Sequence, residues 1–214
     1  MLQPDLFFDL STFEHRELFS EAHYVWDGLK KLKSFMDGAS YRQLPDWAKK
    51  YEPLRTTLVY HDNAFRDGSH LTMEFGDATK GGMKVWQNGR LLDGASVIMA
   101  GAVLAGEKIL LGKGIKIEPG AYIGSPTIIG DMTEIRQGAY LRGYCLIGRK
   151  CVVGHVTEVK HTVFMDEAKA GHFAYLGDSI LGRDVNLGAG TKLANLRFAP
   201  GNVKVRTPEG TIDT

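Results

Sequence analysis

The sequence predicts an all-β solenoid, a parallel β-helix of hexapeptide repeats, over residues 95–198. From residue 111 onward a large apolar side chain recurs at every sixth position, and a mostly small residue follows four positions after each one. A helix needs a period near 3.6 and a flat sheet a period of 2, so neither explains this pattern. Three hexapeptides complete one triangular coil, so residues eighteen apart should stack about 4.8 Å from each other. The large residues are Leu111, Ile117, Ile123, Ile129, Ile135, Leu141, Ile147, Val153, Val159 and Met165.

The period breaks once inside this region. After Met165 it resumes at Tyr175, which is ten residues on rather than six, and continues through Leu181, Leu187 and Leu193. We therefore expect residues 167–172 to form a loop extruded between regular coils. The residue after each large apolar residue is expected to be a corner, where glycine is favoured.

The region before the repeat is expected to supply a cap. Residues 11–37 predict one amphipathic helix, with a capping box at Ser11 and Glu14 and apolar residues spaced three and four apart. This helix should pack on the solenoid or on a neighbouring subunit. Residues 41–90 are rich in Gly and Pro and predict irregular structure. The chain is therefore divided into a helix and capping region (1–94), the β-helix (95–198) and a C-terminal extension (199–214).

Composition excludes several function classes. The 214 residues carry a net charge of +1, which gives no broad electrostatic case for nucleic acid. Nowhere does an apolar run approach the roughly 20 residues of a spanning helix, and the first residues lack the basic segment of a secretory signal. We expect a cytoplasmic protein with no membrane partner. Cys145 and Cys151 occupy small inward positions and are interpreted as buried, reduced thiols.

Two cations break the repeat in a way that indicates chemistry. Arg142 and Lys160 lie eighteen residues apart, so they should stack on adjacent coils. At about 5 Å two cations repel by roughly 1 kcal/mol in water and by more in a drier site. A shared anion would relieve this repulsion, so the pair is a candidate phosphate or carboxylate clamp. The alternative is that both side chains splay into solvent.

Three histidines lie close in sequence: His155, His161 and His172. Some β-helix enzymes hold zinc between subunits, so a metal site must be weighed. No tight histidine spacing recurs and no acidic partner is evident for each ring, so we expect no metal. A single histidine acting as a base, with Glu158 to set its tautomer, needs fewer residues.

Three stretches carry a resemblance to a known family: GHVTEVK at 154–160, AGHFAYLGD at 170–178 and VNLGAGT at 185–191. They resemble the acetyltransferase domain of the bifunctional N-acetylglucosamine-1-phosphate uridyltransferase/glucosamine-1-phosphate acetyltransferase family. ANLR at 194–197 is similar to the archaeal branch in particular. The resemblance covers about residues 95–206. It implies a left-handed β-helix that forms a homotrimer, with its sites between subunits.

The resemblance also implies roles for individual residues. His172 matches the base that deprotonates the 2-amino group of the sugar before it attacks acetyl-coenzyme A. Arg142 and Lys160 match the residues that hold the sugar phosphate, which agrees with the stacked-cation argument. The remaining matches are Tyr175 and Asn186 to sugar-binding positions, Asn195 to an Asn near the reacting acetyl group, Ala189 to a backbone contact with the pantetheine arm, and Glu158 to a residue that orients His172.

The chain also departs from the family. Nothing before residue 95 resembles the nucleotidyltransferase domain, so uridyl transfer by this chain is not expected. Family members continue for several coils that complete the coenzyme A groove, whereas this sequence ends at Thr214 in a polar stretch. Either residues beyond it complete the acyl-donor site, or that site is incomplete.

Three functions stay open. The leading hypothesis is a trimeric, acetyl-coenzyme A-dependent N-acyltransferase acting on an amino sugar phosphate. The second is a non-catalytic β-helix related to nucleotidyltransferases, which binds a sugar phosphate or nucleotide sugar or regulates a partner protein, because a fold and even its site residues can outlive an activity. The third is a zinc-dependent hydratase of the β-helix type, which a metal analysis would test.

Overall fold

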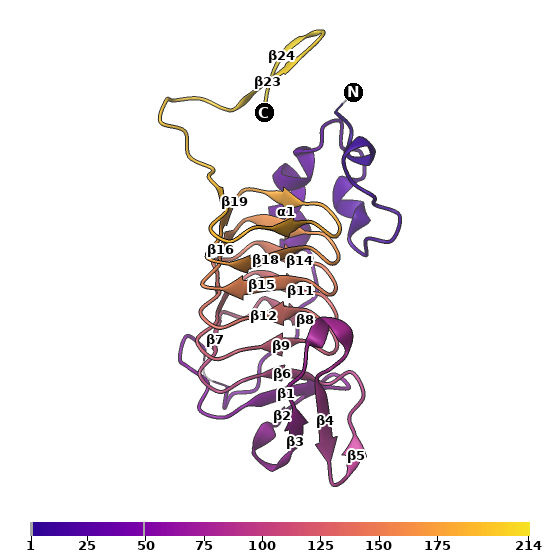
Figure 1. The fold of residues 1–214 in the computed structure, drawn as a ribbon, viewed down its shortest axis with the longest axis vertical. Coiled ribbons are helices and arrows are strands. Elements are labelled where there is room, and N and C mark those ends of the chain that lie inside the picture. The colour runs from indigo at the N-terminus through magenta and orange to yellow at the C-terminus, as the bar shows by residue number, and fades with distance from the viewer. Residues whose placement is uncertain (1, 49) are drawn as a thin grey trace.

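A computed structural model describes residues 2–48 and 50–214. Its centre is a column of triangular coils with three parallel sheets as walls (Figure 1). We call these walls face 1, face 2 and face 3 in the order in which each coil meets them. The predicted parallel β-helix of hexapeptide repeats is confirmed, and it contains about five turns.

Face 1 has eight strands, of which the first two pair antiparallel and the rest parallel. In spatial order they are β2 (Ala64–Asp67), β1 (Leu58–His61), β6 (Ser96–Ile98), β9 (Lys116–Ile117), β12 (Glu134–Ile135), β15 (Val152–His155), β18 (Lys169–His172) and β21 (Asn186–Leu187). Face 2 consists of β7 (Val103–Ala105), β10 (Tyr122–Gly124), β13 (Tyr140–Leu141), β16 (Glu158–Lys160), β19 (Tyr175–Gly177) and β22 (Lys192–Leu193). Face 3 consists of β8 (Ile109–Leu111), β11 (Thr127–Ile129), β14 (Cys145–Ile147), β17 (Thr162–Phe164) and β20 (Ile180–Leu181).

The apolar period fills the interior as the sequence predicts through Val159. Ile117, Ile135 and Val153 stack on face 1, and all three side chains are fully buried. Cys145 and Cys151 are buried free thiols, which confirms their inward assignment. Burial raises the pKa of both thiols to about 12, so neither is a reactive thiolate.

Beyond Val159 the expected phase is wrong, and no loop is extruded at 167–172. Residues 169–172 form strand β18, and Phe164 rather than Met165 faces inward. The cause is a shorter corner between faces 2 and 3. Arg142 and Lys160 occupy equivalent positions in successive coils. Gly143 and Tyr144 separate Arg142 from β14, whereas only His161 separates Lys160 from β17. Register steps therefore fall from eighteen residues to seventeen, as in the pairing of Val159 with Leu176.

This slip moves Tyr175 to the outside. Leu176 is fully buried, whereas the Tyr175 side chain lies in register with the outward Glu158. The series of inward residues thus continues through Phe164, Ala170, Leu176 and Leu181. Two steps of five residues, from Val159 to Phe164 and from Leu176 to Leu181, shift a period of six by as much as one insertion of four residues. The sequence pattern alone does not distinguish the two cases.

Glycine has two separate duties in the coils. The glycines directly after large residues do not adopt a positive φ. They allow the backbones of neighbouring coils to approach closely. At Gly154 an added Cβ would lie 1.7 Å from the carbonyl oxygen of Gly171. Left-handed conformations occur two residues later, at Gly120 and Gly138, with φ of 75° and 70°. Only a residue without a Cβ adopts such values at no steric cost.

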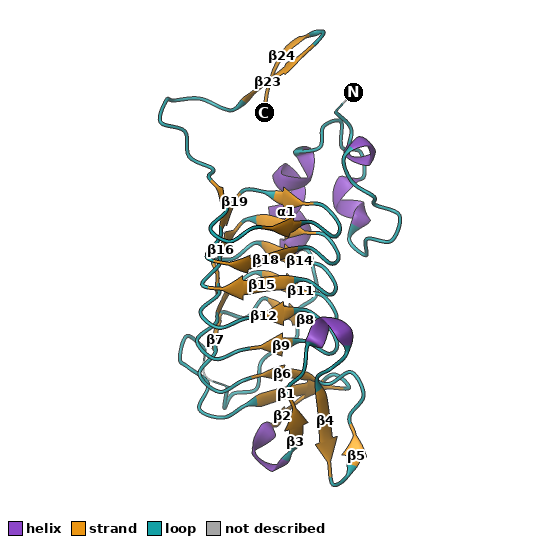
Figure 2. Cartoon of the chain, in the orientation of Figure 1, coloured by secondary structure: helices purple, strands orange, loops and turns teal. Residues whose placement is uncertain are grey.

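The N-terminal arm, residues 2–41, covers the outer side of face 3 (Figure 2). The expected single helix over 11–37 is wrong. The only α-helix of the described chain is α1 (Asp27–Asp37), preceded by the 3-10 turns η1 (Pro4–Leu6) and η2 (Arg16–Phe19). Phe13 and Phe19 join α1 in an apolar cluster with outward residues of face 3. A single helix could not turn all of these side chains toward one flat sheet.

Residues 41–90 are more regular than expected. Tyr60 and His61 end strand β1, and Asp62 with Asn63 makes a left-handed hairpin turn into β2. A second antiparallel sheet contains β3 (Thr72–Glu74), β4 (Lys84–Gln87) and β5 (Arg90–Leu91), with the turns η3 (Gly68–His70) and η4 (Ala78–Lys80). It packs against the lower outer side of face 1.

The two ends of the solenoid differ. At the first end, Leu44, Leu54 and Leu58 join the interior cluster, so the capping that a solenoid needs comes from this region. At the other end, Leu187 and Leu193 are only partly buried. The chain then extends away to a hairpin of β23 (Lys204–Thr207) and β24 (Gly210–Asp213).

One buried carboxylate ties the second sheet to face 1. Glu134 is 2% exposed and accepts hydrogen bonds from the Ala78 backbone N–H at 2.9 Å and from the Arg136 Nε at 2.9 Å. Its other partner, the Lys116 ammonium, lies at 2.8 Å. Burial alone would raise the pKa of Glu134, but these partners together lower it.

Glu134→Gln should therefore destabilise the fold by about 3 kcal/mol at neutral pH, because it leaves buried cations without their carboxylate. Since the folded pKa is depressed, this contribution is complete above the unfolded value of about 4.5 and is lost as pH falls through the folded pKa. Urea unfolding of both variants between pH 3 and pH 8 measures the difference. Glu107→Gln, which breaks an exposed pair with Lys50, is the control and should leave the stability nearly unchanged. A pH-independent difference would contradict the assignment.

Candidate functional site on face 2 and its edges

The predicted phosphate-binding pair lies on the outer side of face 2. Leu141 is in register with Val159, so the following residues, Arg142 and Lys160, occupy adjacent coils one above the other. Both side chains are about two-fifths exposed, at 42% and 41%. Their backbone positions are those expected from the eighteen-residue spacing.

Each cation of the pair already has a carboxylate partner. Arg142 Nη1 donates to Glu158 Oε1 at 2.9 Å, and this bond raises the pKa of the arginine further. Lys160 Nζ lies 3.8 Å from Asp178 Oδ2. The carboxylates remove the like-charge repulsion that the sequence argument invoked. An incoming phosphate would have to compete with them.

Tyr175 and Asn195 extend this group along face 2. The Tyr175 hydroxyl is 3.1 Å from Asn195 Oδ1 and donates to it, and the Asn195 amide donates to Asp178 Oδ2. Burial would raise the pKa of Asp178, but hydrogen bonds from Asn195 and His161 and the charge of Lys160 lower it. The carboxylate of Asp178 is thus the centre of a polar cluster.

His172 lies at a different edge, the corner between faces 1 and 2. It ends strand β18, is in register with His155 of the previous coil, and is exposed. In the next coil Gly190 donates its N–H to the His172 carbonyl at 3.0 Å, which places Ala189 beside His172 in the ladder. The predicted base and the predicted pantetheine contact are therefore neighbours.

Most of the predicted site residues lie apart from His172. Arg142 and Lys160 align with Gly177, five residues beyond it. Asn186 begins β21 and is exposed on face 1 in register with Lys169. Glu158 has Arg142 as its partner, so its expected role in orienting His172 has no hydrogen bond to support it in this chain. In the ladder Asn195 aligns with Asp178, which is six residues beyond His172. At about 3.3 Å per residue, the backbone path from His172 to Asp178 is about 20 Å.

Sequence reasoning gave no role to two residues of the cluster, His161 and Asp178. His161 Nδ1 lies 2.6 Å from Asp178 Oδ1. The signal was obscured by the phase slip, because an eighteen-residue step from His161 leads to Ser179 rather than to Asp178. The two residues are seventeen apart, which is the spacing of the shorter coils.

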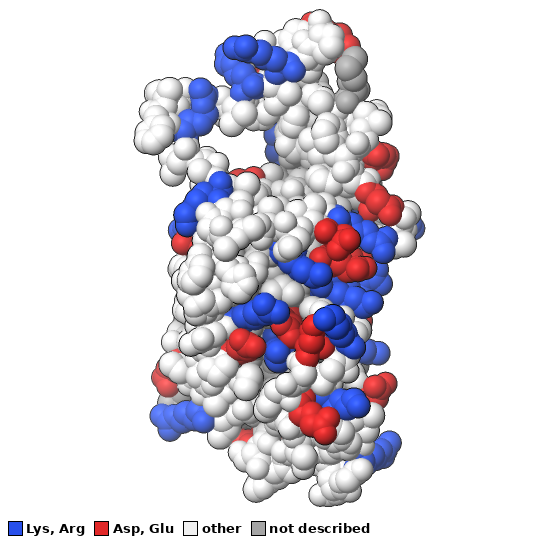
Figure 3. All heavy atoms as spheres, viewed as in Figure 1, with Lys and Arg blue, Asp and Glu red and all other residues white. Residues whose placement is uncertain are grey.

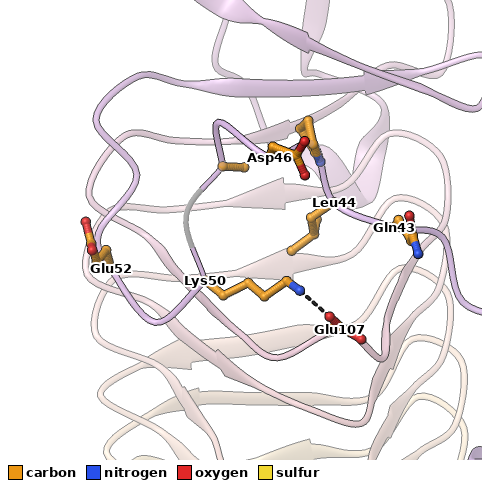
Figure 4. Close-up of a pocket in the computed structure, with 8 residues that line it drawn as sticks. Gln43, Leu44, Asp46, Lys50, Glu52 and Glu107 are labelled. Carbon is orange, nitrogen blue, oxygen red and sulfur yellow. Dashed lines mark hydrogen bonds and ion pairs between the residues drawn. The ribbon is translucent and has the colours of Figure 1, made fainter.

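Other parts of the surface offer less. A hollow of about 570 Å³ lies between the loop 43–52 and Glu107, where Lys50 points to Glu107 (Figure 4). None of the predicted site residues lines it. Within residues 2–48 and 50–214 no three or more metal-binding side chains gather. The same part of the chain has no helix of the length and apolarity that crossing a membrane requires. Acidic and basic side chains are interspersed over the face seen in Figure 3.

The fold and face 2 together define a hexapeptide-repeat β-helix with a cation-bearing outer face, and comparisons with known proteins narrow the class. Residues 126–209 match the family model described as the GMPPB C-terminal domain. The chain is similar to the bifunctional sugar-1-phosphate nucleotidylyltransferase/acetyltransferase of Sulfurisphaera tokodaii, with 45% identity over 98 residues, 46% of this chain and 24% of that protein. It is also similar to the bifunctional protein GlmU of Methanococcus aeolicus, with 38% identity over 116 residues, 54% of this chain and 27% of that protein.

The resemblance read from the motifs is thus confirmed for the β-helical part of the chain. The chain spans about a quarter of the length of these curated relatives. Among solved structures, it is similar to a mutant of perosamine N-acetyltransferase from Caulobacter crescentus in complex with CoA and GDP-perosamine. That match has a TM-score of 0.38 and 24% identity, and covers 45% of this chain and 47% of the other.

The pairing of Arg142 with Glu158 leads to a binding prediction. Glu158→Gln removes the carboxylate that competes with an anion for Arg142, so the affinity for inorganic phosphate should rise about threefold to tenfold. Isothermal titration calorimetry at low salt measures this. Glu209→Gln, in the C-terminal hairpin, is the matched control and should leave the affinity unchanged. Weaker binding by Glu158→Gln would contradict the competition between the carboxylate and the anion.

Proposed function

We propose that this chain carries the acetyl-transfer activity of its relatives: N-acetylation of an amino sugar phosphate by acetyl-coenzyme A, in the biosynthesis of nucleotide sugars. The observation that carries the proposal is the arrangement on face 2. Arg142 and Lys160 lie on adjacent coils of this face, Tyr175 stands beside them, and His172 lies at its edge. The match to the GMPPB C-terminal domain, over residues 126–209, covers these same coils.

In the proposed reaction the phosphate binds Arg142 and Lys160 of one copy, and the sugar lies against Tyr175 of that copy. Its 2-amino group points toward His172 of a second copy. The neutral amine attacks the thioester carbonyl, a C–N bond forms and the C–S bond breaks. His172 takes the proton from nitrogen and returns it to the leaving thiolate of coenzyme A. The Ala189 backbone beside His172 is suited to the pantetheine arm. Donors aimed at the carbonyl oxygen would stabilise the charge that develops there.

A homotrimer is part of the proposal, and two observations support it. Asn195, matched to a position near the acetyl group, is far from His172 in its own chain, and so are Arg142 and Lys160, so a site with all of these residues would combine two copies. Moreover, Val156 and Phe173 are exposed at 50% and 52% at the corner that holds His172. Both have a positive φ, of 49° and 51°, at a corner where neighbouring coils carry glycine. An exposed, strained apolar ridge is explained if a second copy covers it.

We further place the protein in the cytoplasm, where its two buried thiols stay reduced. The identity of the sugar is proposed only at the level of an amino sugar 1-phosphate or its nucleotide derivative. Binding of such a sugar without catalysis is the second candidate function, because no hydrogen bond between described residues orients the His172 ring.

The function is tested by thiol release from acetyl-coenzyme A in the presence of glucosamine-1-phosphate. Turnover should be present in the wild type and should fall by at least about a hundredfold in His172→Ala, with sugar-phosphate binding nearly intact. His155→Ala, one coil below, is the matched control and should retain most of the turnover. Binding without turnover in the wild type would instead establish the non-catalytic alternative.

The trimer has its own test. Phe173→Gly removes the exposed ring and relieves the left-handed backbone, so the fold should stay stable while the assembly weakens. Light scattering after size-exclusion chromatography should show three chains for the wild type and a concentration-dependent loss of trimer for the variant. A wild type that is monomeric at tens of micromolar would overturn the assembly.

A further inference from the structure

The corner between faces 2 and 3 carries a column of residues in an unusual conformation. Tyr144, His161 and Asp178 occupy consecutive coils with φ of 50°, 47° and 46°. Non-glycine residues seldom adopt the left-handed region, and aromatic side chains there are costly. Glycine would form the same corner without that cost, so the side chains call for an explanation.

His161 incurs a second cost. Its side chain is only 16% exposed, and its Nε2 is buried with no hydrogen-bond partner among the described residues. The Tyr144 ring lies edge-on to it, with centroids 6.3 Å apart. A buried nitrogen without a partner is unfavourable. Among the described residues the ring makes one polar contact, the 2.6 Å bond to Asp178.

Asp178 distributes its two oxygens between different partners. Oδ1 receives the His161 Nδ1–H, since a carboxylate can only accept, and Oδ2 receives the Asn195 amide. Lys160 Nζ remains 3.8 Å from Oδ2, which is too long for a direct hydrogen bond. His161 thus turns the carboxylate so that it holds Asn195 but leaves the ammonium of Lys160 loosely paired.

We propose that His161 and Asp178 are positioning residues of the acetyl-transfer site: the His161–Asp178 bond fixes the Asn195 amide and keeps Lys160 available for the phosphate of the sugar. This inference rests on the proposed function, since it assigns the acceptor to Lys160 and the acetyl group to Asn195. Neither positioning residue touches the reacting atoms. Without the imidazole, Asp178 is free to turn, to pair closely with Lys160 and to release Asn195.

The acceptor side should therefore suffer when the bond is lost. His161→Ala should lower kcat/KM for glucosamine-1-phosphate about tenfold, because Lys160 pairs more closely and Asn195 is released. The KM for acetyl-coenzyme A should stay within twofold, because the proposed contact with the pantetheine arm is the Ala189 backbone and not Asn195. His161→Asn should restore kcat/KM to within about threefold, because its amide can donate to Asp178 and Asn tolerates the left-handed conformation. A merely structural role would not separate the two substrates in this way.

Tyr144→Phe is the matched control. It alters the same corner one coil below and removes the hydroxyl bond to Asp37 of α1, at 3.3 Å, without touching Asp178. Its kinetic constants should equal those of the wild type. If His161→Ala changes both KM values in parallel, or if His161→Asn fails to rescue, the positioning role is wrong.

A calorimetric readout keeps this test separate from that of the proposed function. Binding of glucosamine-1-phosphate should weaken about tenfold in His161→Ala and recover in His161→Asn, whether or not the wild type turns over. A wild type without turnover but with this binding pattern would overturn the acetyl transfer and leave the assignment of His161 to Lys160 intact. Equal binding by wild type and His161→Ala would overturn the positioning role.

Discussion

The backbone ladder between successive coils is the constraint on which the rest of the structure depends. Apart from β1 and β2, each strand of a face pairs in parallel with the strands of the neighbouring coils, so a paired residue has a fixed neighbour seventeen to nineteen positions away. Backbone N–H and C=O groups cannot be left unpaired inside such a column. The ladder therefore stacks the buried apolar rows, and it also aligns the polar residues on the outside. Arg142 meets Lys160 and His155 meets His172 for this reason, not because their side chains attract one another.

The corners determine where this alignment changes. A one-residue corner at His161 shortens the coil, shifts the phase, and turns Tyr175 outward onto the face that carries Arg142 and Lys160. The same corner brings His161 within hydrogen-bonding distance of Asp178. One local change in the chain thus places both the tyrosine and the polar cluster on face 2. The N-terminal arm on face 3 and the second sheet on the lower part of face 1 leave face 2 without such a covering layer.

Much of this was predictable from the sequence. The period of six gave the fold class, the inward rows through Val159 and the stacking of Arg142 on Lys160, because each of these depends only on a regular ladder. The sequence could not give the phase beyond Val159, since two missing corner residues and one inserted loop of four residues shift a period of six by the same amount. The arm was also mispredicted: its apolar spacing suits a helix, yet its aromatic residues pack against a flat sheet. The polar cluster around Asp178 depends on the seventeen-residue coil, so it became visible only with the register.

The central claim is that acetyl transfer takes place in a site shared between copies, with His172 from one chain and Asn195 from another. Mixing His172→Ala chains with Asn195→Ala chains tests it directly, after each variant has been shown to be inactive alone and the two have been unfolded and refolded together. In a random mixture of trimers, a shared site contains both intact residues in about a quarter of cases, so about a quarter of the wild-type thiol release should return. If His172 and Asn195 act within one chain, no mixture restores both residues to the same site. Activity that stays absent at every mixing ratio would contradict the account.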